Sequence, residues 1–456
     1  MHCDHDIAIV GGGAAGTLAA IHLLRQARPG SRIAVYEPSP RPGEGVAYST
    51  RRREHLLNVP AGRMSALSDE PADFLRWLAG REEYAGGGDL SGCYLPRRDY
   101  AAYLRDRLRE AVATSAATLE LRHHRITALR RHDTGLSLEW EDGRATAGSV
   151  LLATGNAPRP LPARGASTLG APRLLEAWDS EGLATIAPDA RVCIVGTGLS
   201  MVDVVLTLAG TGHRGPVHLL SRHGLLPLAH APDSPVDTGL DVDALLALDL
   251  RARLRRLRQR VAEAAADGLP WQAVLERLRP RVQALWRSLH AADQRRFLRH
   301  VVRYWDIHRH RIAPEADAVL QELRGSGRLQ LHRARLDLVT AGPRCVHVVA
   351  RDHHGNALPL DVEHVVNATG VELRVQAMRN PLLEQLLGDG LAEAGAHGIG
   401  LATDAEGRLV DAHGIARDDL RAIGSLRIGE AWESLAVPEL RQQAQALACA
   451  WSDVAA

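Results

Sequence analysis

Apolar residues near the start of the chain are spaced in two different ways, and the change between them predicts a β-strand followed by an α-helix. Residues 7–10 form a continuous apolar run of strand type, whereas Leu18, Ile21 and Leu24 recur at helical spacing. A second short apolar run follows at 33–36. The segment as a whole therefore predicts a βαβ unit.

The chain between residues 38 and 156 shows weaker versions of both patterns. Segment 38–50 is rich in glycine and proline, which predicts a loop. The remaining elements predicted here are helices at about 71–79 and 95–113 and strands at 119–121, 136–140 and 150–153.

A second βαβ pattern starts at residue 191, with strands predicted at 192–195 and 217–220 and a helix at 202–208 between them. From about 241 to 323, Leu, Ala and Arg dominate at helical spacing, which predicts an insertion of four or five helices. Two βαβ units predict an α/β fold with two Rossmann-like dinucleotide-binding domains. The later predicted elements are strands at 329–331, 346–349 and 365–368 and a final helix at 437–451.

The first strand and its helix are joined by Gly11-Gly12-Gly13-Ala14-Ala15-Gly16, which has the spacing G-x-G-x-x-G. Gly11 allows a tight turn, Gly13 lets the backbone approach a pyrophosphate, and Gly16 lets helix and strand pack closely. The helix start, with Ala14 and Ala15, offers free N–H groups to phosphate oxygens. Glu37 follows 21 residues after Gly16, where a carboxylate binds a ribose. The pattern predicts a dinucleotide site with an unphosphorylated ribose rather than a bare glycine turn.

The second βαβ unit carries a variant of this motif, in which Met201 replaces the third glycine. The strand that follows ends in Ser221-Arg222 instead of an acid. Because an arginine at this place accepts a 2′-phosphate, NADPH is predicted here in preference to NADH. The alternative is that Arg222 is a solvated surface residue. The residues predicted to bind this coenzyme are Gly196, Gly198, Leu199, Ser200, Ser221 and Arg222.

Composition excludes several classes of protein. All 55 basic residues are arginine, so no lysine can form a Schiff base. The net charge of +1 and the acids interleaved with arginine in 241–323 favour a solvated helical face over nucleic-acid binding. The five cysteines form no C-x-x-C pair, so neither a disulfide framework nor a metal site is predicted. With no apolar run of about 18 residues and no leader-like start, a cytoplasmic location without membrane contact is expected.

Two dinucleotide motifs, with Ala-Thr-Gly at 153–155 and 368–370, resemble the two-dinucleotide-binding-domain flavoproteins. Several stretches are similar to a bacterial family of FAD/NAD(P)-binding proteins related to flavin-containing and N-hydroxylating monooxygenases. Segment 95–104 resembles the N-hydroxylating enzymes in particular. The stretches are GEGVAYS at 43–49, HLLNVP at 55–60, GTGL at 196–199 with Asp203, WDIHRHR at 305–311, WE at 432–433 and AVPELR at 436–441.

The resemblance implies that FAD binds to the first motif and NAD(P)H to the second. Residues 1–160 and 365–456 would form the FAD domain, and 161–364 the NAD(P)H domain with the helical insertion at 241–323. The chain lacks the C-x-x-C of related disulfide reductases. Segment 169–178 also lacks the F-x-G-x-x-x-H of related ketone oxygenases.

The implied activity is that of an NADPH-dependent flavoenzyme. The first hypothesis is a single-component monooxygenase that uses O2 and a flavin C4a-hydroperoxide to hydroxylate a small polar substrate, for which an amine nitrogen is one candidate position. The second is a flavin reductase or dehydrogenase with an organic acceptor. The third is a non-catalytic flavin-binding scaffold or sensor, which a second nucleotide site argues against. The oligomeric state is not predicted.

Candidate site residues outside the glycine turns come partly from the chemistry of their side chains and partly, as for Asn58 and Met64, from the resemblance. Arginine can bind a carboxylate and histidine can move a proton, so Arg309, Arg311 and His308, expected in a loop that ends at Pro314, are candidates for the substrate site together with Asn58. The alternatives are an ion-pair cluster or a contact with the NADPH phosphates for this group, and a loop asparagine for Asn58. Further cofactor-binding candidates are Gly45, Tyr48, Asn58, Met64, Thr154, Gly155, Thr369, Gly370, Gly424, Trp432 and Glu433.

Overall fold

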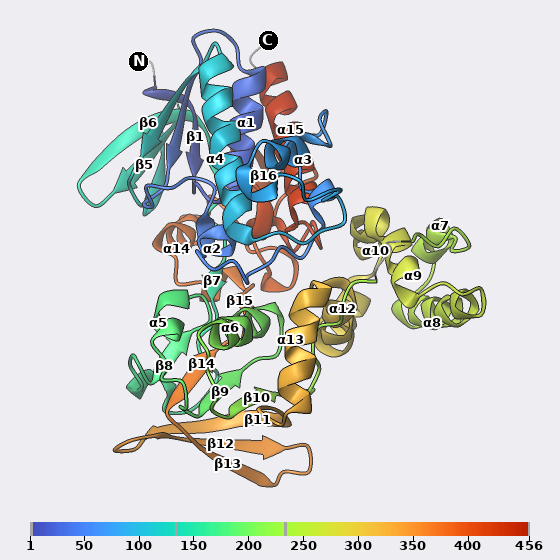
Figure 1. The fold of residues 1–456 in the computed structure, drawn as a ribbon. Helices are drawn as coiled ribbons and strands as arrows, with labels where there is room; N and C mark the ends of the chain where they lie inside the picture. The colour runs from blue at the N-terminus through green and yellow to red at the C-terminus, as the bar shows by residue number, and fades with distance from the viewer. Residues whose placement is uncertain (1–2, 133–134, 232–234, 455–456) are drawn as a thin grey trace. The chain divides into compact units, whose positions relative to one another are not determined.

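The computed structural model describes residues 3–132, 135–231 and 235–454 (Figure 1). Its contacts divide the chain into two compact units. Unit 1 contains residues 1–51, 59–158 and 371–456, and unit 2 contains residues 52–58 and 159–370. A short segment from the first part of the chain therefore belongs to unit 2.

Unit 1 is built on a sheet whose central strands are parallel. The strands run in the order β16 (Arg408–Val410), β17 (Ala416–Ala422), β6 (Gly143–Leu152), β1 (His5–Val10), β2 (Arg32–Tyr36) and β3 (Thr118–Arg122). All neighbours from β17 to β3 are parallel, and β4 (Ala128–His132) and β5 (Gly135–Trp140) extend the sheet from β6 as antiparallel strands.

Helices cover both faces of this sheet. Helix α1 (Ala14–Gln26) packs against α4 (Arg97–Thr114) and α15 (Val437–Val454), as Figure 1 shows. On the other face, α14 (Pro381–Gly388) contributes Leu382, Leu383 and Leu386 to a core that includes Val10 and Leu152. The smaller helices of unit 1 are α2 (Gly45–Tyr48) and α3 (Asp73–Ala79).

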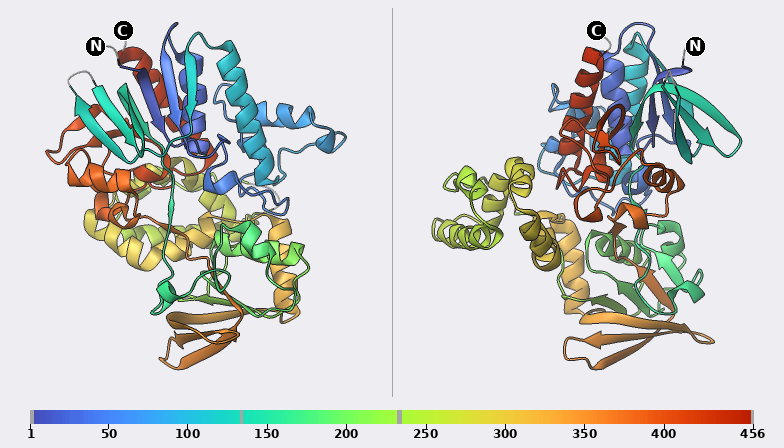
Figure 2. Two further views of the ribbon diagram at one scale, coloured as in Figure 1. Left: turned by 90° about the vertical axis from the view of Figure 1, so that its left-hand side faces the viewer. Right: turned by 180° about the vertical axis from the view of Figure 1, so that it is seen from behind.

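Unit 2 is also built on a parallel sheet, which is extended at one edge by antiparallel strands. Its strand order is β13 (Ala357–Val362), β12 (Val346–Asp352), β11 (Leu329–Ala341), β10 (Val217–Ser221), β9 (Val192–Val195), β14 (His364–Asn367) and β8 (Leu174–Glu176). Strands β11 to β8 are parallel, whereas β11, β12 and β13 form an antiparallel extension, visible from two further sides in Figure 2. Helix α6 (Leu199–Gly210) follows β9, and α5 (Ser180–Ala184) packs against α6.

The predicted helical insertion contains more and shorter helices than expected. The sequence predicts four or five, but seven α-helices start between residues 241 and 323. Asp241 and Asp249 cap new helix starts by accepting hydrogen bonds from Ala244 N and Ala252 N, and Pro270 precedes another start. The helices are α7 (Val242–Leu246), α8 (Leu250–Ala266), α9 (Trp271–Leu278), α10 (Val282–Arg287), α11 (Ala291–Arg296), α12 (Val302–Arg309) and α13 (Pro314–Gly325), with a π-helical turn at Phe297–Val301.

Three other predictions are wrong in detail. Segment 38–50, predicted as a loop, contains α2. Residues 305–309, also predicted as loop, lie in α12. Strands β4 and β13 were not predicted. Strand β11 is far longer than 329–331 because its second half alternates polar with apolar residues instead of forming a continuous apolar run.

Candidate functional site

The first glycine turn lies at the carboxyl end of β1, and its glycines are required by close contacts. Gly11 has a φ of +108°, and its N–H donates to the Tyr36 carbonyl at 2.8 Å. A Cβ on Gly11 would overlap the carbonyl oxygen of Ala153, and a Cβ on Gly16 would overlap that of Gly11. Gly11 and Gly16 therefore allow β1, β6 and α1 to meet at this turn.

Glu37 is held against this turn by two backbone donors. One carboxylate oxygen accepts from Gly12 N at 2.8 Å and the other from Ser39 N at 2.9 Å. A Cβ on Gly12 would lie 2.7 Å from the Glu37 Cβ, so a larger residue at 12 would displace the carboxylate. Gly12 is a site residue that the motif alone did not single out, because it occupies a variable position of G-x-G-x-x-G.

Several predicted cofactor residues converge on the same edge of the sheet. Parallel strands end together, so Thr154 and Gly155 after β6 and Gly424 after β17 lie at the edge that carries Gly11 and Glu37. A Cβ on Gly424 would be 3.4 Å from the Ala15 Cβ, and one on Gly45 would be 3.1 Å from the Gly13 Cα.

The residues around this edge fit a bound dinucleotide. Helix α1 starts after Gly13 without a side-chain cap and without an acid in its first turn, so its first N–H groups are available to an anion. Within the described part of the chain, the buried hydroxyls of Thr154 and Ser425 have no hydrogen-bond partner. Buried hydroxyls are normally paired, so polar ligand atoms are suitable partners for these two.

Two other candidates of unit 1, Met64 and Tyr48, pack against the protein itself. Met64 is almost fully buried. Tyr48 is half-buried and packs on Tyr100, with the ring centroids 5.0 Å apart. The fold gives both a packing role, and a flavin contact for either one stays a prediction.

The segment before α15 is tied to the same edge by one side chain. The Gln443 amide oxygen accepts from Gly424 N at 3.2 Å, and its amide nitrogen donates to the Ser434 carbonyl at 3.0 Å. Between these anchors, Trp432 is buried and Glu433 has a φ of +64°, a conformation uncommon for residues other than glycine. Such an outlier within a candidate site motivates a functional test.

The second glycine turn, in unit 2, follows the plan of the first. Gly196 has a φ of +105°, and its N–H donates to the Leu220 carbonyl at 2.9 Å. Helix α6 starts at Leu199 and Ser200 after Gly198, which provides no side-chain cap. Met201, fully buried, takes the position that Gly16 has in the first turn.

Strand register places Ser221 where the first unit has Glu37. Val10 is opposite Tyr36 in unit 1, and Val195 is opposite Leu220 in unit 2, so the next residues along are Glu37 and Ser221. The Ser221 hydroxyl lies 2.9 Å from the Thr197 hydroxyl and accepts from Gly224 N at 3.1 Å. The carboxylate that would bind a ribose is thus replaced by a short neutral side chain.

Basic side chains surround Ser221, and we call Arg222, His223 and Arg333 the basic group. Arg222 and His223 are exposed after β10, and Arg333 is opposite Ser221 in the β10–β11 register. Desolvation lowers the pKa of His223, and the charges of Arg222, Arg303 and Arg333 lower it further. Tyr304 in α12, 51% exposed, has its ring 6.4 Å from that of His223.

Arg333 and Tyr304 are residues that the sequence did not indicate. Arg333 is more than a hundred positions from Ser221 and is brought beside it only by strand register. Tyr304 comes from the helical insertion. The predicted residues Thr369 and Gly370 follow β14, the strand that pairs with β9. The Thr369 hydroxyl donates to the Asn367 side chain at 2.7 Å.

The candidate substrate cluster at 305–314 is engaged in helix packing. Arg311 is 4% exposed and is paired with Glu276 of α9. His308 in α12 donates through Nδ1 to the Tyr304 carbonyl at 2.7 Å and packs edge-on against Trp271 at 4.9 Å. The anion expected beside Arg311 is therefore supplied by the protein itself. Arg309 is half-buried at the end of α12.

Asn58 also belongs to unit 2. Its carbonyl accepts from His230 at 3.1 Å, and the neighbouring His55 contacts the Thr207 hydroxyl of α6 at 2.8 Å. Segment 52–58 is thus anchored on the second dinucleotide fold. Catalytic roles for Asn58, His308, Arg309 and Arg311 stay predictions.

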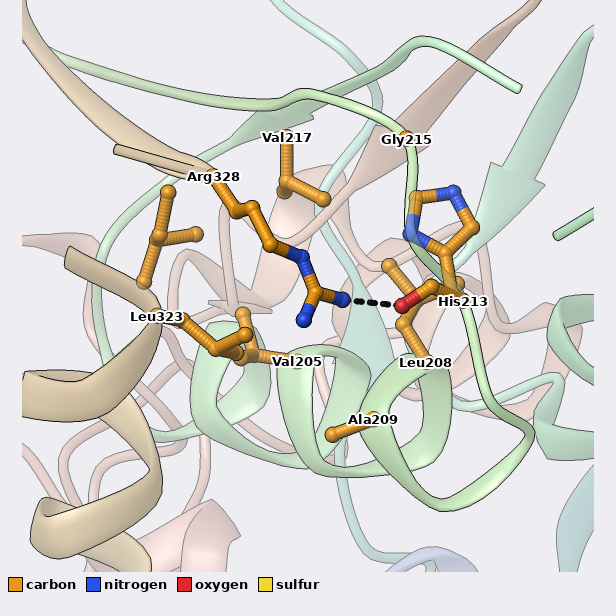
Figure 3. A pocket seen from close by; sticks show the side chains of 9 residues that line it. Val205, Leu208, Ala209, His213, Gly215, Val217, Leu323 and Arg328 are labelled. Carbon is orange, nitrogen blue, oxygen red and sulfur yellow. Dashed lines mark hydrogen bonds between the residues drawn. The ribbon is translucent and has the colours of Figure 1, made fainter. Parts of the chain in front are cut away.

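A small crevice of unit 2, shown in Figure 3, lies between α6, α13 and β10. It is lined mainly by apolar residues such as Val205, Leu208 and Leu323, and Arg328 crosses it to donate to the His213 carbonyl. The crevice is small and mainly apolar, as expected where helices pack on a sheet, and it does not have the size or the polar lining of a nucleotide site.

Unit 1 is a Rossmann-like unit with Glu37 after its second strand, and unit 2, inserted into it along the chain, is a second such unit with Ser221 at the equivalent place. Residues 8–157 match the family model described as FAD-NAD(P)-binding. No helix of the described residues is both long and apolar enough to cross a bilayer.

Individual relatives share part of the sequence or the fold. The L-aspartate N-monooxygenase (nitrosuccinate-forming) of Streptomyces cremeus is 29% identical over 265 residues, which cover 48% of this chain and 39% of that protein. Ornithine N-hydroxylase from Kutzneria sp. 744 has a similar structure, with a TM-score of 0.66 at 14% identity over 99% of this chain and 100% of that one. L-Lysine 6-monooxygenase from Pseudomonas syringae gives a TM-score of 0.65 at 16% identity, with complete coverage of both chains. The predicted fold class is confirmed.

Proposed function

We propose that the protein is an FAD-dependent monooxygenase that takes hydride from NADPH and hydroxylates the amine nitrogen of a small, amino-acid-like substrate. The observation that carries the oxidoreductase assignment is the difference between the two turns: Glu37 stands at one, and Ser221 with the basic group stands at the other. A chain that binds two different dinucleotides, FAD at one turn and NADPH at the other, is suited to hydride transfer from NADPH to FAD. The N-hydroxylation rests on the Streptomyces relative, of which the match spans about two fifths.

In this proposal the residues of the chain bind and orient FAD, and FAD itself carries out the redox chemistry. The α1 N-terminus would bind the pyrophosphate, Glu37 the ribose, and the Thr154 hydroxyl a polar atom of the ligand. Bound FAD supplies two-electron chemistry and reactivity with O2.

Selectivity for NADPH over NADH is proposed for the basic group. Arg222 and Arg333 flank Ser221, and two guanidinium groups suit a dianionic 2′-phosphate. Arg222→Ala and Arg333→Ala should each weaken NADPH binding by roughly ten- to a hundredfold, the effect of losing a charge-assisted contact. NADH binding should change little.

The matched control is Arg335→Ala, because Arg335 is exposed two residues further along β11 and points to the same face. Kd values for both coenzymes, from flavin reduction under nitrogen, test the proposal. Equal losses for NADPH and NADH would contradict a 2′-phosphate contact.

Oxygen use separates the monooxygenase from a reductase with an organic acceptor. The purified protein is reduced with NADPH under nitrogen and then exposed to air with L-aspartate, L-ornithine or L-lysine. A monooxygenase forms hydroxylated amine in step with NADPH consumption. A reductase forms only hydrogen peroxide, and a scaffold is not reduced by NADPH at all.

The residues that bind the substrate are proposed to include Arg309, His308 and Asn58 of unit 2. Arg309→Ala should leave FAD content and the rate of flavin reduction normal while product is lost. Slowed reduction at saturating NADPH would instead indicate a coenzyme contact. A cytoplasmic location is also proposed, and cell fractionation tests it.

A further inference from the structure

Three side chains with metal-ligating atoms meet on the β12–β13 pair of unit 2. The Cys345 sulfur lies 4.0 Å from Nδ1 and 3.9 Å from Nε2 of His347. His347 Nδ1 is 2.6 Å from a carboxylate oxygen of Asp361. One potential ligand atom from each residue lies within 4.8 Å of the other two.

The backbone places these side chains on one face. A tight turn, closed by a 2.8 Å hydrogen bond from Gly342 N to the Cys345 carbonyl, sets Cys345 just before β12. Cys345 and His347 are two residues apart and share a face, and Asp361 is directly opposite His347 in the antiparallel register. A Cβ on Gly342 would lie only 2.7 Å from His347 Nε2, so glycine leaves room for the ring.

The surrounding charges suit a divalent cation. An ionised Cys345 and Asp361 carry two negative charges, which match those of one such ion. Arg191 is one cation whose charge acts on Cys345 and Asp361, and its carboxylate partner is Glu363, with nitrogen–oxygen distances of 2.7 and 3.3 Å. The pKa of Arg191 is raised chiefly by its hydrogen bond to Glu363, so this carboxylate holds the Arg191 guanidinium.

We propose that Cys345, His347 and Asp361 form a binding site for Zn2+ or a similar divalent transition metal. Bond lengths of about 2.0–2.3 Å in a tetrahedral site put ligand atoms about 3.4–3.6 Å apart. The observed sulfur–nitrogen distances of 3.9 and 4.0 Å are longer than that spacing, and the nitrogen–oxygen distance of 2.6 Å is shorter, so side-chain rotations that move the Cys345 sulfur toward His347 and the Asp361 carboxylate away from it are needed to reach it. The His347 and Asp361 side chains are 50% and 56% exposed, so they can rotate and water can complete the coordination.

Cobalt titration of the full-length protein tests this proposal. Protein treated with a chelator under nitrogen is titrated with Co2+, whose thiolate charge-transfer band reports a bond to cysteine, and Zn2+ is then added in competition. We expect one equivalent of Co2+ per chain, displaced by Zn2+. Cys345→Ser should abolish the band, and His347→Ala and Asp361→Asn should weaken binding at least about tenfold.

Two controls show whether the signal comes from this site. Cys93→Ser removes a different partly exposed thiol, and His354→Ala removes an exposed histidine elsewhere in the β12–β13 pair. Both should bind Co2+ like the unaltered protein. Absence of the band, or its persistence in Cys345→Ser, would overturn the proposal and leave a cross-strand hydrogen bond between His347 and Asp361.

Discussion

Residue size at two equivalent positions, Gly12 and Thr197, distinguishes the two glycine turns. In unit 1, Gly12 leaves space for Glu37, whose carboxylate accepts the Gly12 N–H. In unit 2, Thr197 fills the equivalent space, and its hydroxyl contacts the shorter Ser221. The glycine spacing, Glu37 and Ser221-Arg222 were visible in the sequence because each is local to a strand end. Gly12, Thr197 and Arg333 were not, because their roles arise from contacts across the sheet.

Gly13 and Gly16 should respond differently to substitution. A Cβ on Gly13 would be 3.4 Å from the Gly45 Cα, an ordinary contact, whereas one on Gly16 would overlap the Gly11 carbonyl. Gly13→Val should therefore fold but purify colourless, because its methyl groups block the phosphate path at the α1 N-terminus. Gly16→Ala should lower the free energy of unfolding by about 1–3 kcal/mol. Flavin absorbance and thermal melting measure the two effects, and full flavin in Gly13→Val would contradict the assignment.

Helices and strands were predictable where apolar periodicity is strong, as in β1, α1, β9 and α15. The helical insertion was predicted as a whole but not divided correctly, since caps and prolines set its helix ends. The role of residues 305–311 could not be judged from sequence, because Glu276, the partner of Arg311, lies in another helix.

The Arg311–Glu276 pair should be structural. Both side chains are almost fully buried, and removing one partner of such a pair costs about 3–5 kcal/mol. Arg311→Met should therefore lower the melting temperature, and Arg311→Met combined with Glu276→Leu should recover most of it. If the stable double variant still fails to form product while flavin reduction is normal, Arg311 contacts the substrate as well.

At the scale of the whole molecule, buried and half-buried histidines should make stability depend on pH. Burial lowers the pKa of His22 and His213, and of His218 and His332, whose rings are joined by a 3.1 Å contact. The unfolded chain protonates these groups near pH 6.5, and the folded chain only at lower pH, so the unfolded state binds more protons between the two values. The contribution of these histidines to the free energy of unfolding is therefore fully present above about pH 6.5 and is lost as the pH falls below it.

This dependence can be measured by thermal melting between about pH 7.5 and 5. The melting temperature should fall over that interval, and His332→Gln should flatten the decline by removing one of the paired histidines. His354→Ala, which removes an exposed histidine, should leave the slope unchanged. An unaltered slope in His332→Gln would show that this pair does not contribute.

The nested order of the units has a consequence for how the protein is made. Ribosomes release the chain from its N-terminus, so segment 52–58 and residues 159–370, which complete unit 2, all emerge before β17 and α15. Until those last elements arrive, β6 lacks β17, one of its neighbours in the sheet, and α1 lacks α15, one of its packing partners. The glycine turn synthesised first is thus finished last, after all of unit 2 has been made.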